Sequence, residues 1–207
     1  PTGGQIVFKD DGTGEYTCQT DNQKELIKNE DIYFYKEKGK EYQFDKEGKL
    51  IKITEEDGWV TNFSYDNNKL TQIKSNAGIL KYSWEGNYIV NASINGIEVK
   101  YEYKSGNLVK VTNADGDSCA YEYNENNNLT LMTDYEGNEY VKNEYDSIGR
   151  VIKQKVADSG EYTFTYDDEK RENSCKSESG NVHTIKYNED FYIIEDVEQD
   201  TTTYDYN

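Results

Sequence analysis

The stretch Tyr145-Asp146-Ser147-Ile148-Gly149-Arg150-Val151 decides the fold of this 207-residue chain. It places an aromatic residue and an acid before a glycine-containing turn, and a second apolar run begins after that turn. An aromatic residue recurs at successive intervals of 21, 19, 19, 20, 22, 21, 21 and 19 residues, at Phe44, Tyr65, Trp84, Tyr103, Tyr123, Tyr145, Tyr166, Tyr187 and Tyr206. A steady period of about 20 residues indicates a repeat architecture.

A second column stands two residues before the first and indicates that each repeat contains a strand. Seven of its nine members are aromatic, in the series Tyr42, Phe63, Tyr82, Tyr101, Tyr121, Asn143, Phe164, Ile185 and Tyr204. Side chains two residues apart share one face of a strand, so the two columns predict one aromatic stripe. We expect this stripe to form the core.

Turn-forming residues follow the first column and then close each unit. Asp, Asn and Gly supply local side-chain hydrogen bonds and positive φ angles, which hairpin turns require. They recur after the aromatic residue at Asp45 to Gly48, Asn67-Asn68 and Ser105-Gly106, and again at Asp57-Gly58, Asp115-Gly116 and Glu136-Gly137. Each unit therefore reads as one β-hairpin.

These residues resemble the YD repeat of the RHS family, in which a Tyr-Asp pair is followed by Gly-Arg and an apolar residue. Tyr145 to Val151 is the best local match, and Phe44-Asp45-Lys46-Glu47-Gly48-Lys49-Leu50 is nearly as close. The resemblance covers residues 40 to 207. Small secreted bacterial proteins of unknown function with similar hairpin repeats are an equally good match. The resemblance extends to large RHS shells, and in those shells a coiled sheet of such repeats encloses a toxin or other cargo.

We therefore predict an all-β fold, an antiparallel meander of tandem hairpins that forms a strongly coiled, barrel-like or spiralling sheet. Only 34% of the residues are hydrophobic, but 20 tyrosines argue against disorder, because a tyrosine ring can stabilise a thin sheet. Residues 1–41 are expected to be irregular N-terminal capping strands, and residues 42–207 one continuous domain of hairpin repeats.

Charge bears on the partners and the location of the protein. The net charge of −18 disfavours binding to nucleic acid and to anionic lipid surfaces. The sequence has no apolar run near the ~20 residues of a membrane span, so we expect no membrane insertion. The composition and the resemblance favour an extracytoplasmic location, whether secreted, periplasmic or at the cell surface. The unfinished last repeat, Tyr204 to Asn207, predicts an edge strand available for pairing.

Residues with catalytic or ligand-binding chemistry are few. We expect Cys18, Cys119 and Cys175 to be free thiols in the sheet, and His183 to be an ordinary strand residue. The acids of Asp115-Gly116-Asp117 and Asp134-Tyr135-Glu136-Gly137 match no calcium loop, and turn chemistry explains them. We predict no catalytic residue, no cofactor and no metal site, and hence no enzyme.

Aromatic residues outside the two columns are the candidates for ligand binding. We select Trp59, Tyr88 and Tyr135, since aromatic rings at turns could line a glycan site. The favoured function is a non-catalytic scaffold or binding module that presents a surface to another surface protein or a glycan. The alternative is a fragment of a larger RHS shell, adhesion or toxin-delivery protein. An enzyme acting on an extracellular polymer is a distant third.

Overall fold

The computed structural model describes residues 6–10, 12–18 and 24–199, and these residues form 20 β-strands and no helix. The all-β prediction is confirmed. The chain divides into two compact units, Pro1–Val99 and Lys100–Asn207. The predicted boundary between residues 41 and 42 stays a prediction, although β4 and β5 pair across it, with Tyr35 opposite Tyr42.

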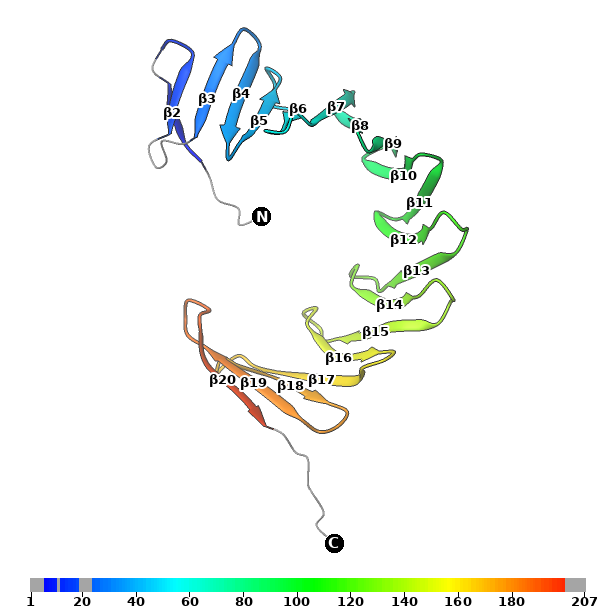
Figure 1. The fold of residues 1–207 in the computed structure, drawn as a ribbon. Coiled ribbons are helices and arrows are strands. Elements are labelled where there is room, and N and C mark those ends of the chain that lie inside the picture. The colour runs from blue at the N-terminus through cyan, green and yellow to red at the C-terminus, as the bar shows by residue number, and fades with distance from the viewer. Residues whose placement is uncertain (1–5, 11, 19–23, 200–207) are drawn as a thin grey trace. The chain divides into compact units, whose positions relative to one another are not determined.

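Strands follow one another in sequence order within each unit (Figure 1). The first series is β1 (Phe8–Asp10), β2 (Glu15–Cys18), β3 (Glu25–Asn29), β4 (Ile32–Glu37), β5 (Lys40–Phe44), β6 (Leu50–Thr54), β7 (Val60–Asp66), β8 (Lys69–Ser75), β9 (Gly78–Glu85) and β10 (Tyr88–Ile94). The second series is β11 (Ile97–Lys104), β12 (Asn107–Thr112), β13 (Ser118–Tyr123), β14 (Leu129–Thr133), β15 (Glu139–Tyr145), β16 (Val151–Val156), β17 (Gly160–Asp167), β18 (Glu172–Ser177), β19 (Val182–Tyr187) and β20 (Ile193–Gln199).

Each strand in a unit pairs antiparallel with the next, which confirms the meander. In unit 2 the ladder runs from β11–β12 through to β19–β20. Among the described residues, no pairing joins the first strand of a unit to its last, so neither unit closes on itself. The barrel-like alternative is therefore wrong for each unit, because closure would require its first and last strands to pair.

Two kinds of turn connect the strands, and both use the residues that the sequence pattern singled out. Two-residue turns such as Asn67-Asn68 have both residues at positive φ, 47° and 65°. The longer turns are held by the acid or amide after the aromatic column. In the decisive stretch, Asp146 Oδ1 accepts hydrogen bonds from the Ile148 and Arg150 backbone N–H groups at 3.0 and 2.9 Å.

A β-bulge accompanies most of these hairpins. The register shifts immediately before the aromatic residue, for example between Glu122 and Tyr123 and between Glu144 and Tyr145. After the shift, Tyr123 lies opposite Leu129, and Tyr145 lies opposite Val151. A bulge adds one residue to the second strand and increases the local twist.

Burial shows that each unit is a single layer. Among the described residues only Cys119, at 5% exposure, and Asn143, at 9%, are buried. The aromatic stripe is half-buried, as at Tyr101, Tyr121 and Tyr123. The expected core is therefore one face of a sheet, and no second layer formed by described residues packs on it within the unit.

Candidate functional site at the seam between hairpins

The repeated feature of the structure is the contact between the second strand of one hairpin and the first strand of the next, which we call the seam. At the seam, the side chain of the aromatic column donates a hydrogen bond to a backbone carbonyl at the start of the preceding strand. The bonds are Tyr65 Oη to Leu50 O (2.9 Å), Trp84 Nε1 to Leu70 O (2.8 Å), Tyr123 Oη to Leu108 O (2.9 Å), Tyr145 Oη to Leu129 O (2.6 Å) and Tyr166 Oη to Val151 O (2.7 Å).

Register explains why the same carbonyl is reached each time. Lys153 lies opposite Thr163 in the β16–β17 ladder, so continuing that register by three residues places Tyr166 opposite Arg150. The ring therefore lies beside the last residue of the preceding turn, and its hydroxyl reaches the carbonyl of the next residue, Val151. A tyrosine suits this position because its ring is apolar and its tip donates a hydrogen bond.

The residue opposite the aromatic ring contacts the following hairpin. Arg150 stacks over the Tyr166 ring, with 4.4 Å between the guanidinium carbon and the ring centroid. It also donates to both oxygens of Asp168, at 2.8 and 2.9 Å, and from Nε to Asp146 Oδ2 at 2.7 Å. Arg150 thus connects the acid of its own turn to the aromatic ring and turn of the next hairpin.

Other hairpins carry a related contact at the same place. Lys69 lies 5.6 Å from the Trp84 ring centroid and donates from Nζ to the Gly86 carbonyl. Arg171 donates to Glu189 Oε1 at 2.9 Å, and Asn107 Nδ2 donates to Asn127 Oδ1 at 2.8 Å. These residues were missed as functional candidates in the sequence. The signal was a basic or amide residue directly before the second apolar run of a unit.

The contact of Arg150 with Asp146 and Asp168 shifts the pKa values of Asp146 and Arg150. Hydrogen bonding to the Arg150 guanidinium lowers the pKa of the Asp146 carboxyl, and the two backbone N–H groups of the turn act in the same direction. The bond to Asp146, and then that to Asp168, raise the pKa of Arg150. The Asp of the Tyr-Asp pair therefore serves both turn closure and the seam.

Asn143 stands where the second column predicts an aromatic residue. Its Nδ2 donates to Leu129 O at 3.0 Å and to Tyr145 Oη at 3.3 Å, and its Oδ1 accepts from Gln154 Nε2 at 3.0 Å. The Asn143 amide donates to the same Leu129 carbonyl as the Tyr145 hydroxyl, so the seam hydrogen bond is kept. A buried amide with both ends bonded is tolerated in a sheet.

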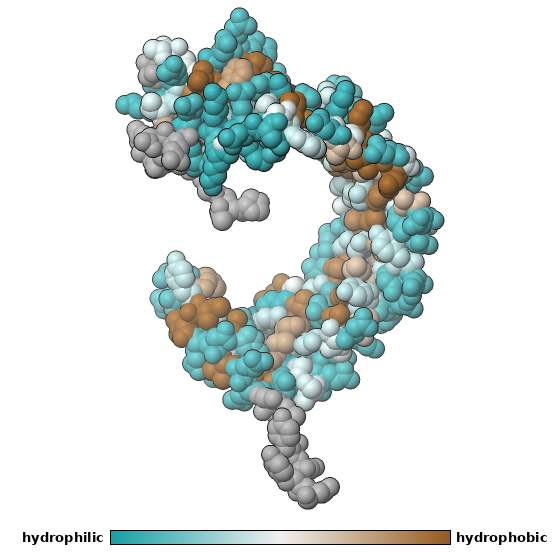
Figure 2. Space-filling model, viewed as in Figure 1, coloured by the Kyte–Doolittle hydropathy of each residue, from teal (hydrophilic) through white to brown (hydrophobic). Residues whose placement is uncertain are grey.

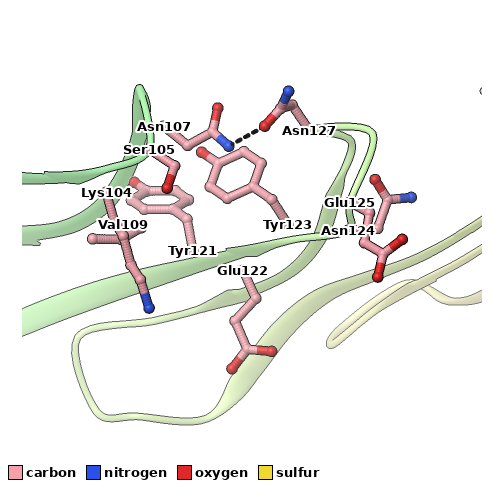
Figure 3. A pocket seen from close by; sticks show the side chains of 10 residues that line it. All are labelled: Lys104, Ser105, Asn107, Val109, Tyr121, Glu122, Tyr123, Asn124, Glu125 and Asn127. Atoms are coloured by element: carbon pink, nitrogen blue, oxygen red, sulfur yellow. Dashed lines mark hydrogen bonds between the residues drawn. The ribbon is translucent and has the colours of Figure 1, made fainter.

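A groove of about 500 Å³ opens at the tips of hairpins β11–β12 and β13–β14. Figure 3 shows Tyr121 and Tyr123 projecting from β13 toward the Asn107–Asn127 pair, while Glu122 points away from it. The remaining lining residues are polar or small: Lys104, Ser105, Val109, Asn124 and Glu125. Aromatic faces next to amides are the chemistry that a sugar ring requires for stacking and hydrogen bonding.

The three predicted ligand residues lie on different hairpins. Trp59 lies in the turn before β7 and Tyr88 begins β10, both in unit 1, while Tyr135 lies in the β14–β15 turn of unit 2. Their exposures are 51%, 42% and 48%, so all three rings reach solvent. Binding by Trp59, Tyr88 or Tyr135 stays a prediction.

The cysteines are free thiols, as predicted. Cys119 Sγ lies 3.4 Å from Tyr121 Oη, and this contact together with burial raises the pKa of Tyr121 to about 12. His183 is a strand residue of β19, also as predicted, and its Nε2 lies 2.5 Å from Asp196 Oδ1.

The acidic stretches form turns. Asp134 Oδ1 accepts from the Glu136 and Asn138 N–H groups, and Asn113 Oδ1 accepts from Asp115 and Asp117. The part of the chain that is described contains no group of three side chains able to hold a metal ion. That part also contains no helix long and apolar enough to cross a membrane.

Comparison with known families identifies the repeat. Residues 101–139, from β11 into the start of β15, match the RHS Repeat family. The matched segment is similar to an RHS repeat. It contains the Tyr123–Leu108 seam bond and the groove beside it. No curated protein matches the chain.

Solved structures of toxin complexes are similar to the chain at low identity. The crystal structure of TcdB2-TccC3-TEV is 11% identical, with a TM-score of 0.45, over 84% of this chain and 12% of that one. The Photorhabdus luminescens Tc holotoxin pore is 12% identical, with a TM-score of 0.43, over 95% and 14% of the two chains. TcdB2-TccC3 without its hypervariable C-terminal region is 11% identical, with a TM-score of 0.42, over 91% of this chain and 14% of that one. The chain thus spans about one-eighth of the length of these proteins.

Replacing Tyr123 by Phe tests the seam bond. The variant keeps the ring but leaves the Leu108 carbonyl without its donor, so we expect a loss of roughly 0.5–1.5 kcal/mol in the free energy of unfolding. The measurement is urea unfolding followed by tyrosine fluorescence. Tyr140→Phe in β15 is the matched control, because the Tyr140 ring is exposed, and it should stay within about 0.5 kcal/mol of the wild type. Equal effects of the two changes would contradict the seam.

Replacing Arg150 by Gln tests the link between hairpins through its pH dependence. The folded pKa of Asp146 is lowered below its unfolded value of about 3.9. The Asp146–Arg150 ion pair therefore stabilises the fold above about pH 4, and this stabilisation is lost as the pH falls through the folded pKa of Asp146. The urea midpoint of R150Q should lie below that of the wild type at about pH 6, and the gap should narrow toward about pH 3. Lys155→Gln, on an exposed lysine of β16, should show no such narrowing. A constant gap for R150Q would refute the link.

Proposed function

We propose that this chain is a non-catalytic wall segment of an RHS-repeat shell, located outside the cytoplasm. The observation that carries the proposal is the RHS match at residues 101–139, which falls on the hairpins β11–β12 and β13–β14; the seam between them recurs along both units. A wall requires an element that can be added repeatedly, and the seam hydrogen bond recurs at five hairpins. The RHS resemblance supports the extracytoplasmic location.

The two faces of the sheet also suit a wall. One face carries the aromatic stripe, and the other carries lysines and acids in register across neighbouring strands. Examples are Lys110 with Glu102 at 3.3 Å, Lys153 with Glu161 at 2.9 Å and Lys186 with Glu195 at 2.9 Å. Exposed pairs of this kind contribute little to stability, but they keep one face hydrated. A single layer with one hydrated face can separate an enclosed volume from solvent.

The native size of the polypeptide tests the wall proposal. An antibody raised against the recombinant chain should detect, in the producing cell, a polypeptide several times longer than 207 residues. The recombinant chain serves as the size marker on the same blot. Detection of a product the size of the marker, with none larger, would overturn the proposal. Hydrolysis of an extracellular polysaccharide or protein by the purified chain would overturn its non-catalytic part.

A binding module is the second candidate, and the tip groove favours it. Tyr121, Tyr123, Asn107 and Asn127 meet there, and the groove is large enough for a saccharide unit. Under this reading the chain presents the groove to a glycan of a surface, or to another surface protein. The tyrosine faces would stack on sugar rings, and the amides would hydrogen-bond to hydroxyl groups.

A glycan array tests this second candidate. It also distinguishes binding in the tip groove from binding by the exposed ring of Trp59. If the groove binds, Asn107→Ala should lower the signal for any bound glycan by about 10-fold, because it removes one convergent polar group and releases Asn127. Trp59→Ala is the matched variant in the other unit and should leave the signal unchanged. The reverse pattern would assign binding to Trp59, and an array without signal would leave the groove without a ligand of this class.

A further inference from the structure

Three seams of unit 2 share one arrangement of side chains. A residue of one hairpin stands 18 positions before an acid of the next hairpin, and an aromatic residue stands two positions before that acid. The three sets are Arg150, Tyr166 and Asp168; Arg171, Tyr187 and Glu189; and Asn107, Tyr123 and Glu125. The third set differs in one respect, because it has an amide where the other two have an arginine.

In the first two sets the arginine binds the acid of the next hairpin. Arg150 Nη1 donates to both oxygens of Asp168, at 2.8 and 2.9 Å, and its guanidinium stacks over the Tyr166 ring. Arg171 Nη2 donates to Glu189 Oε1 at 2.9 Å. A guanidinium group suits this position because its N–H donors point outward from its edge while its flat face covers an aromatic ring.

The third set has the ring and the acid but lacks the cation. Asn107 Nδ2 donates to Asn127 Oδ1 at 2.8 Å, and its short side chain ends there. Within the described part of the chain, the Glu125 carboxylate has no ion pair or hydrogen bond, and no cation lies over the Tyr123 ring. The tip groove of about 500 Å³ opens at this seam.

The nearest cation does not fill the groove. Figure 3 shows that Lys104 and Glu122 extend away from the tyrosine rings, toward the other face of the sheet. The Glu125 carboxylate lies on the outer side of its turn and is exposed. Rotation of the Glu125 side chain is therefore enough to bring it to a cation that stacks on Tyr123. The backbone of the turn need not move.

We infer that the tip groove receives an arginine side chain of a second, basic polypeptide, whose guanidinium stacks on Tyr123 and donates to Glu125. The incoming group takes the place that Arg150 occupies in its own seam. The net charge of −18 favours the approach of a basic segment. Figure 2 shows the largely hydrophilic surface that such a segment would meet. This inference names the ligand of the groove, and it rests on the binding-module candidate rather than on the wall.

The chain itself distinguishes arginine from lysine at this position. Arg150 and Arg171 face an acid two positions after the aromatic residue. Lys69 instead faces Gly86, which holds that position after Trp84, and donates to the Gly86 carbonyl. Glu125 is an acid, so its set follows the arginine pattern. A neutral sugar could stack on the rings, but it would leave the charge of Glu125 without a counter-ion.

Supplying the cation from within the chain tests the site without a ligand. Asn107→Arg should raise the urea midpoint more in the wild-type background than in the Glu125→Gln background, because the new guanidinium needs the carboxylate. Asn87→Arg, in the β9–β10 turn, adds the same charge elsewhere and should act equally in both backgrounds. An effect of Asn107→Arg that is independent of Glu125 would overturn the inference.

The ligand test uses the full chain and N-acetyl-arginine methylamide, whose only charge is the guanidinium. Binding is followed by the NMR shifts of the backbone amides of residues 104–109 and 121–128. We expect saturable shifts in these two segments with a Kd on the order of 1 mM, as befits one small group. The citrulline derivative has the same shape without the charge and should not bind detectably. The lysine derivative should bind about 3- to 10-fold more weakly than the arginine derivative.

Variants of the chain then locate the site. Glu125→Gln should weaken binding of the arginine derivative by about 3- to 10-fold, and Asn107→Arg should abolish it because the site is filled from within. Glu136→Gln, at an exposed acid of the β14–β15 turn, is the matched control and should bind like the wild type. Equal binding of the arginine and citrulline derivatives would overturn the inference. Unchanged binding in E125Q or in N107R would do the same.

These outcomes are separate from the tests of the two proposed functions. A glycan-array signal that requires Asn107, without any shift by the arginine derivative, would keep the binding module and overturn arginine as its ligand. Arginine binding by a chain whose native product is no longer than the size marker would support this inference and remove the wall.

Discussion

The structure depends on one constraint: within each unit, the described residues form no second layer of secondary structure over the sheet. Among the described residues only Cys119 and Asn143 are buried, so a strand is stabilised mainly by the neighbours on its two edges. The seam hydrogen bond stabilises the contact between neighbouring strands where no second layer does so. It brings a large ring onto the start of the preceding strand and gives the carbonyl there a donor in the same contact, as Tyr166 does at Val151.

The same constraint accounts for the turn and the bulge in each hairpin. The ring reaches the correct carbonyl only when the preceding turn ends at a defined residue, and Asp146 enforces this by binding two N–H groups of its turn. The bulge before Tyr145 then sets that residue opposite Val151. The two residues of the Tyr-Asp pair therefore have complementary roles. The Asp accepts the hydrogen bonds that close its own turn, and the Tyr donates a hydrogen bond to the preceding hairpin.

An architecture stabilised at its edges has consequences for function. Each seam is local, so hairpins can follow one another without a limit set by a shared core, as in other repeat proteins. This property suits a wall. The same turn and bulge recur in the β19–β20 hairpin, where Tyr187 lies opposite Ile193.

The sequence by itself determined the hairpins, their period, the aromatic stripe and the role of acids such as Asp134 and Asp146 in turns. These features depend on residues close together in the chain, where the strand period and turn chemistry act directly. Only the tertiary structure decided that Arg150 contacts Tyr166 and Asp168, that Asn143 can replace an aromatic residue, and that neither unit closes into a barrel. Those outcomes depend on the register between successive hairpins, and the bulges shift that register by a residue in a way that spacing alone does not specify.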